Sequence, residues 1–123
     1  MDVETLVLRL YAALGTGDEE TLLALLHPNF VGRFAEGMPA GAGRADGPGA
    51  ARDHWWEIGA AYSARPIVEE IVPCLDGRLL VRGRYCGTRR SDGRPLDAAF
   101  THLWNASDGR LTQLHQLTDT ALW

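Results

Sequence analysis

Three Asp-Gly pairs divide the second half of the chain into four segments that read as β-strands. The pairs are Asp76-Gly77, Asp92-Gly93 and Asp108-Gly109. Asp-Gly is favoured in tight hairpin turns, because both residues tolerate the positive φ angles that such turns require. This half therefore predicts an antiparallel meander. Its expected strands run over 67–75, 79–88, 96–106 and 111–120.

The first half has the spacing of helices instead. Apolar residues recur every three or four positions over 2–14, and two glycines end that run. Asp18 is placed to cap a second, short helix, which the His27-Pro28 pair ends. The remaining elements expected here are a weak strand over 29–37, a loop over 38–49 rich in Gly, Ala and Pro, and a helix that Pro48 opens and that ends near Ser63.

Helices followed by a meander indicate an α+β fold in which three helices pack on a curved antiparallel sheet. The 123 residues, 46% of them hydrophobic, are enough for one core without disulfides or metal. We therefore expect a single domain over 1–123.

Charge and composition exclude several classes of function. The net charge is −4, and the twelve basic residues are scattered and all arginine, so neither nucleic acid nor a membrane surface is an expected partner. The absence of lysine excludes a Schiff base and a Walker-type phosphate site. The acidic start MDVETLVLRL does not resemble a signal peptide, and Cys74 and Cys86 are expected as buried thiols. These features predict a soluble, cytoplasmic protein.

The order helix, helix, strand, helix, meander resembles the nuclear-transport-factor-2-like superfamily, which includes ketosteroid isomerases, SnoaL-like polyketide cyclases and limonene-type epoxide hydrolases. The stretches that carry the resemblance are LYAALGTGDEETLLALLHPNFV at 10–31, DGPGAARDHWWEIG at 46–59 and FTHLWNASDGRLTQLHQLTD at 100–119. The resemblance implies a cone-shaped domain with an apolar pocket between sheet and helices, and a homodimer formed through the sheet. Reaction type varies within such a superfamily, so the fold alone does not give the activity.

Asp119 is the first candidate for catalysis. It ends the last predicted strand, where the period of two places it on one face with Gln113 and His115. The resemblance to SnoaL-like cyclases implies that an aspartate at this place moves the proton. A carboxyl group in an apolar pocket has a raised pKa, which suits proton removal beside a carbonyl. The alternative is that Asp119 only caps the strand end near the surface.

Histidines supply the assisting candidates. His115 shares the predicted face with Asp119, and His102 on the preceding strand could pair across the ladder with it. A structural role is equally open for both. With His54 they lie on three different elements and form no metal-binding motif, so neither a metal nor another cofactor is expected.

Aromatic and other side chains are predicted to line the pocket. Adjacent Trp55 and Trp56 cannot both face inward on one helix, so one of them is expected to meet a partner subunit or the loop. Core packing is the alternative role for the aromatic residues. The expected substrate-binding residues are Tyr11, Phe34, Glu36, Met38, Trp55, Arg84, Trp104 and Gln113.

Three of these roles come from the resemblance. Glu36 lies near the place where ketosteroid isomerases carry a general-base carboxylate, and Tyr11 corresponds to a phenol that those enzymes use toward an oxyanion. Limonene-type epoxide hydrolases have an Arg-x-Asp where this chain reads RGRYC at 82–86. The second aspartate is missing, which disfavours epoxide hydrolysis, and leaves Arg84 to orient Asp119 or to bind an enolate oxygen.

The sequence thus predicts an isomerase or cyclase that needs no cofactor and moves a proton on a small hydrophobic carbonyl compound, polyketide-like or steroid-like. Asp119 would act with His115 or His102. The first alternative is a domain of the same fold that binds a small molecule or dimerises without catalysis. Epoxide hydrolysis is a further alternative.

Overall fold

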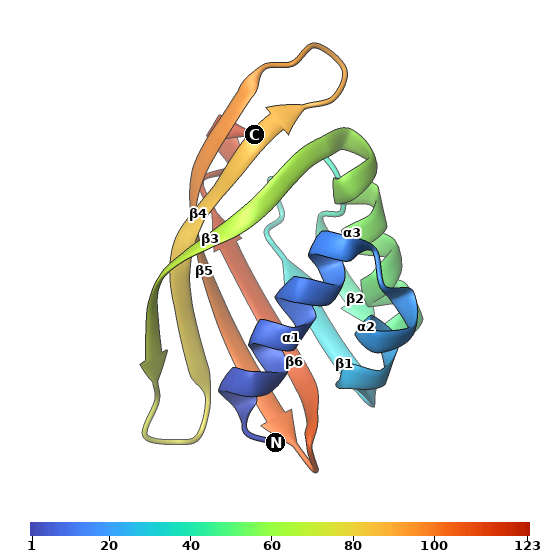
Figure 1. The fold of residues 1–123 in the computed structure, drawn as a ribbon, viewed down its shortest axis with the longest axis vertical. Coiled ribbons are helices and arrows are strands. Elements are labelled where there is room, and N and C mark those ends of the chain that lie inside the picture. Colours follow the sequence, from blue (N-terminus) through green and yellow to red (C-terminus); the bar gives the residue numbers. More distant parts are fainter.

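The computed structural model describes all residues from 1 to 123. In chain order its elements are α1 (Val3–Thr16), α2 (Glu19–Leu25), β1 (Leu26–Phe34), β2 (Gly43–Asp46), α3 (Pro48–Ala61), β3 (Tyr62–Pro73), β4 (Leu79–Arg89), β5 (Pro95–Ser107), β6 (Arg110–Thr118) and the short 3-10 helix η1 (Thr120–Leu122). The six strands form one sheet in the order β2-β1-β6-β5-β4-β3. The three α-helices cover one face of this sheet (Figure 1), so the α+β prediction is confirmed.

Capping residues set the ends of the first two helices. The Asp2 carboxylate accepts the Thr5 N–H at 2.8 Å and starts α1, and Gly17 ends it with a φ of 68°. Asp18 then accepts the Thr21 N–H at 3.1 Å and starts α2. α1 packs on the sheet through buried Leu6, Val7 and Leu10, because these residues share one side of the helix.

The meander forms as the Asp-Gly pairs predict. β3, β4, β5 and β6 pair antiparallel with their neighbours along the chain. Gly77 and Gly93 occupy positive φ angles of 89° and 74° in two of the connections, which few residues other than glycine adopt.

Three expected boundaries were wrong. β1 begins at Leu26 rather than near residue 29, and it joins β6 in parallel, so the sheet is mixed rather than wholly antiparallel. The expected loop over 38–49 contains β2, whose pairing with β1 is made by backbone groups that composition does not reveal. α3 ends at Ala61, and β3 starts at once with Tyr62. Strand pairing across long sequence separations overrides local composition at all three places.

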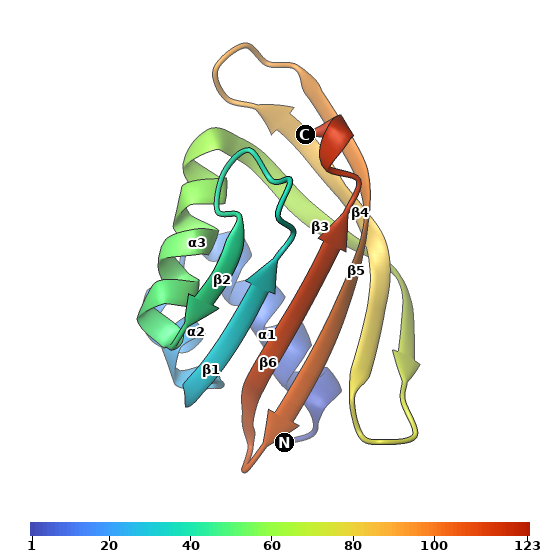
Figure 2. The same ribbon diagram turned by 180° about the vertical axis from the view of Figure 1, so that it is seen from behind.

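The core lies between the helices and the concave face of the sheet. Trp104, Val81 and Leu114 from the strands are fully or almost fully buried in the same cluster as Leu10 of α1 and Ala51 of α3. The opposite face, called the outer face below, carries no helix (Figure 2). Exposed apolar side chains occur on it at Ile67 and Leu117.

Candidate functional site

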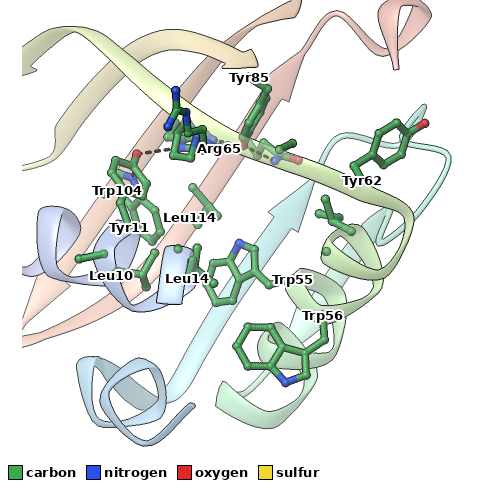
Figure 3. A pocket seen from close by; sticks show the side chains of 18 residues that line it. Leu10, Tyr11, Leu14, Trp55, Trp56, Tyr62, Arg65, Tyr85, Trp104 and Leu114 are labelled. Atoms are coloured by element: carbon green, nitrogen blue, oxygen red, sulfur yellow. Dashed lines mark hydrogen bonds between the residues drawn. The ribbon is translucent and has the colours of Figure 1, made fainter. Parts of the chain in front are cut away.

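A cavity of about 380 Å³ opens between α1, α3 and the concave face of β3 to β6 (Figure 3). This volume lies within the usual range for sites that bind small molecules. Twelve of its eighteen lining residues are hydrophobic. The full lining is Leu10, Tyr11, Ala12, Leu14, Gly15, Trp55, Trp56, Ile58, Gly59, Tyr62, Ala64, Arg65, Pro66, Tyr85, His102, Trp104, Leu114 and Gln116.

The polar wall of the cavity is a chain of three ring side chains. The Tyr11 hydroxyl lies 2.7 Å from Nδ1 of His102, and the Tyr85 hydroxyl lies 2.5 Å from Nε2 of the same ring. His102 is 4% exposed and is therefore almost completely buried. The imidazole thus joins two phenols that come from α1 and β4.

At each end of this row of three rings, an N–H group donates a hydrogen bond to the phenol oxygen. The Trp104 indole N–H donates to the Tyr11 oxygen at 3.2 Å, and the Gln116 side-chain amide donates to the Tyr85 oxygen at 2.8 Å. The backbone N–H of Ala35 donates to the other end of the Gln116 amide at 3.3 Å, which fixes its orientation. These five side chains are called the Tyr-His-Tyr network below, and all of them line the cavity.

Burial keeps the network neutral. It lowers the pKa of His102 from 6.5 to about 3, because the apolar surroundings disfavour the imidazolium. Burial also raises the pKa of Tyr85 and of Tyr11 far above that of a free phenol, partly opposed by hydrogen bonds from Gln116 and Trp104. At neutral pH, one uncharged imidazole therefore lies between two uncharged phenols.

No aspartate or glutamate lines the cavity. Its only charged side chain is Arg65, at the mouth, where a shallow groove of about 670 Å³ continues outward. Arg90 lines this groove and is held there by a 2.8 Å hydrogen bond from its Nε to the Gly59 carbonyl. The cavity therefore offers hydrogen-bond donors at its wall and positive charge at its entrance.

A family model for the SnoaL-like domain matches residues 7–114 of the chain. The chain belongs to the SnoaL-like family. A search of curated proteins gave no significant match.

Solved structures share the fold over nearly the whole chain. Bal32a, from a soil-derived mobile gene cassette, superposes with a TM-score of 0.86 at 23% identity and covers 98% of this chain and 92% of its own. TerC, co-crystallised with polyporic acid, gives 0.81 at 24%, covering 95% and 91%. IdmH, a proposed polyketide cyclase from Streptomyces antibioticus, gives 0.82 at 22%, covering 97% and 93%. At these identities the likeness shows the SnoaL-like fold and not the reaction.

Asp119, the candidate that the SnoaL-like resemblance favoured, lies outside the cavity. It is exposed and sits between β6 and η1, where its backbone N–H donates to the Ala99 carbonyl at 3.2 Å. His115 and Gln113 are also exposed, on the outer face. The predicted inward face of this strand was therefore wrong.

A β-bulge explains the error. Gln113 pairs with Asn105 and Leu111 with Ala106, so Thr112 is an extra residue in β6. Leu111 and Leu114 are consequently both buried, although an odd number of positions separates them. Beyond the bulge, side chains that a period of two would place inside point outward, and Gln116 takes the inward position.

Glu36 and Arg84 also lie away from the cavity. Glu36 is exposed beyond the end of β1. Arg84 lies on the outer face, since its neighbour Tyr85 points inward, and it forms an ion pair with Asp97 at 2.5 Å. The expectation that Arg84 contacts Asp119 or a substrate oxygen has no geometric support.

Of the residues expected to bind substrate, Tyr11, Trp55 and Trp104 lie at the cavity wall. Trp55 and Trp56 both line the cavity, so the prediction that one must turn away was wrong: adjacent helix positions diverge enough to border different parts of a wide cavity. Trp55 extends toward Leu14 (Figure 3). Phe34 lies beneath Trp55, at 5.6 Å between ring centroids, and Met38 belongs to a separate small core, so neither lines the cavity.

Sequence reasoning missed Tyr85 and Gln116 as functional candidates. Tyr85 alternates with Val81 and Gly83 on β4, and Val81 pairs with His102 on β5. This cross-strand register was the available signal, since residues on one face of paired strands meet. Gln116 pairs with His102 and could be found only with the bulge known.

No group of three or more His, Cys, Asp or Glu side chains is placed to hold a metal ion. His54 instead binds the Gly41 carbonyl through Nδ1 at 3.0 Å. Cys74 and Cys86 are free and only half-buried, contrary to the expected burial: Cys74 lies in the connection between β3 and β4, and Cys86 lies on the outer side of β4, near Asp97. None of the helices combines the length and apolar character that crossing a membrane requires.

Proposed function

We propose that the protein is an isomerase or cyclase that works without a cofactor and transfers protons on a small hydrophobic carbonyl compound bound in the cavity. One observation carries the proposal: a buried, neutral imidazole lies between two phenols on the polar wall of an otherwise apolar cavity. Such groups can donate a proton to a carbonyl oxygen and accept one from a neighbouring carbon.

The Tyr-His-Tyr network suits stabilisation of an enol or enolate oxygen. Trp104 and Gln116 hold both phenol oxygens in place, so the hydroxyl groups need little reorganisation when charge develops on the substrate. The apolar walls formed by Leu10, Leu14 and Trp55 make the surroundings of these hydrogen bonds less polar, which strengthens them.

The cavity favours a flat, polyketide-like substrate over an aliphatic one. Tryptophan and tyrosine rings form much of the wall, and aromatic surfaces bind planar ligands at little entropic cost. TerC, which has the same fold, has been crystallised with polyporic acid, and IdmH is a proposed polyketide cyclase. Arg65 and Arg90 at the entrance suit a polar or anionic substituent that extends into the groove.

Hydrogen exchange on a probe ketone tests the proposal. 2-Tetralone is a flat bicyclic ketone with acidic C–H groups, and its exchange in D₂O is followed by loss of the proton signals in NMR. We expect the protein to accelerate this exchange over buffer, and Tyr85→Phe to reduce the acceleration by about a hundredfold. Asp119→Asn should leave the rate unchanged, because this carboxylate is outside the cavity.

A binding protein without catalysis is the second candidate. The observation in its favour is the lack of any carboxylate in the cavity, where a conventional carbonyl enolisation would use one as base. Quenching of tryptophan fluorescence by 2-tetralone, with no exchange above buffer, would support this alternative.

We also propose a homodimer formed through the outer face of the sheet. Leu117 and Ile67 are 54% and 40% exposed there and have no helix over them. Sedimentation of wild type and Leu117→Glu tests this: a dimer that the variant converts to a monomer is the expected result.

A further inference from the structure

The three rings of the Tyr-His-Tyr network carry one more polar hydrogen than the contacts between them use. The neutral ring of His102 carries one N–H, and Tyr11 and Tyr85 carry one O–H each, which makes three hydrogens. The ring makes two contacts with the phenols, at Nδ1 and Nε2, and each contact uses one hydrogen. Trp104 and Gln116 can only donate at their ends, so neither accepts the remaining hydrogen. One phenolic hydrogen is therefore left without an acceptor in the network.

The tautomer of His102 decides which phenol holds this hydrogen. If Nε2 is protonated, it donates to Tyr85, Tyr11 donates to Nδ1, and the Tyr85 hydrogen is free. If Nδ1 is protonated, the order reverses and the Tyr11 hydrogen is free. Both phenols line the cavity, so a bound carbonyl oxygen can accept the free hydrogen in either state.

We propose that Tyr11, His102 and Tyr85 form a proton relay in which one phenol acts as the acid while the other acts as the base. In the forward step the Tyr85 hydroxyl protonates the carbonyl oxygen, the Nε2 proton moves to Tyr85, and the Tyr11 proton moves to Nδ1. The Tyr11 oxygen takes the proton from the substrate carbon beside the carbonyl. The C–H electron pair becomes the C=C bond of the enol, and the C=O π pair binds the new proton.

The relay leaves every protein group neutral. After the step both phenols are protonated again, and only the tautomer of His102 has changed. Returning the proton to a different carbon runs the same transfers in reverse and restores the first tautomer, which completes an isomerisation. The relay rests on the proposed function, and it explains how a cavity without a carboxylate can supply both an acid and a base.

His102→Gln is the decisive variant. A glutamine amide has one donor and one acceptor end, so it can hydrogen-bond both phenols, but it cannot change tautomer and pass a proton. We expect it to retain 2-tetralone binding, measured by tryptophan fluorescence, and to lose hydrogen exchange by at least about a hundredfold. His115→Gln makes the same change at an exposed position and should behave as wild type.

Nitrogen-15 NMR of the His102 ring provides a readout without substrate. Tyr11→Phe removes the partner of Nδ1 and should favour the Nε2-protonated ring, whereas Tyr85→Phe should favour the Nδ1-protonated ring, because a buried N–H needs an acceptor. The same tautomer in both variants would overturn the relay.

Different experimental results would contradict the relay and the proposed function. Exchange that wild type accelerates and His102→Gln keeps would overturn the relay and leave the proposed function standing. Bound 2-tetralone that wild type does not exchange would overturn both. Loss of exchange in His102→Gln, together with opposite tautomers in the two phenylalanine variants, would support the relay.

Discussion

His102 and His115 lie on neighbouring strands but on opposite faces of the sheet, and they differ in almost every property. His102 faces the helices, is 4% exposed and has both ring nitrogens in hydrogen bonds with phenols. His115 lies on the outer face and is exposed. The comparison teaches that the side of the sheet, rather than the residue type, decides which histidine can take part in chemistry.

The largest difference between the two faces of the sheet is expected in the free energy of unfolding that a substitution in β5 removes. Trp104 is fully buried, so we expect Trp104→Ala to lower the free energy of unfolding by about 3–5 kcal/mol. Leu103→Ala, one residue away on the outer face and half-buried, should cost clearly less. Urea denaturation of both variants measures the difference, and equal losses would contradict the assigned faces.

The two glutamines of β6 should differ less in how far their substitution lowers the free energy of unfolding. Gln116→Leu removes the amide that donates to the Tyr85 oxygen and leaves the Ala35 N–H without its side-chain acceptor, so we expect a loss of about 1–3 kcal/mol in the free energy of unfolding. Gln113→Leu is the matched change at an exposed site beside the bulge and should have little effect. The result would be contradicted if Gln113→Leu were the more destabilising.

The pH dependence of stability should separate the two histidines. The pKa of His102 is about 3 when folded and 6.5 in the unfolded chain, so between these values the unfolded chain binds more protons and stability falls as the pH is lowered. We expect a loss of about 1–2 kcal/mol between pH 6.5 and 5. His102→Gln should lack this dependence, and His115→Gln should retain it. Thermal or urea unfolding across this range measures both.

The smallest effect is expected at Arg84. Its ion pair with Asp97 lies on the outer face, whereas the neighbouring Tyr85 of the Tyr-His-Tyr network points to the opposite face. Arg84→Gln should leave 2-tetralone binding and hydrogen exchange unchanged, as measured by fluorescence and NMR. A loss of exchange without a loss of folding would show that the outer face does contribute to the site.

Local sequence signals predicted most of the fold. Helix periodicity, the cap at Asp18 and the Asp-Gly turns act over a few residues, and the structure has the helices and hairpins that they indicate. The parallel pairing of β1 with β6 and the short strand β2 depend on contacts between distant segments. No local pattern records such contacts, which is why these were missed.

The site residues were predictable only where side chains alternate regularly between the two faces of a strand. His102, Trp104 and Tyr11 were correctly placed inside, because β5 alternates regularly and α1 keeps its period. In β6 the bulge at Thr112 interrupts this alternation. The sequence-based prediction therefore placed His115 and Asp119 on the wrong face. Leu111 and Leu114 are the one trace of the bulge in the sequence, as two apolar residues out of step.

The bulge has a consequence for changes of length in β6. If Thr112 were removed, Leu111 would still pair with Ala106 and Gln113 with Asn105, so Gln116 would stay opposite His102 and inside the cavity. The extra residue can therefore be lost without moving any cavity side chain to the other face of the sheet. This strand can change its length in one genetic step while the acid-base groups of the site keep their places.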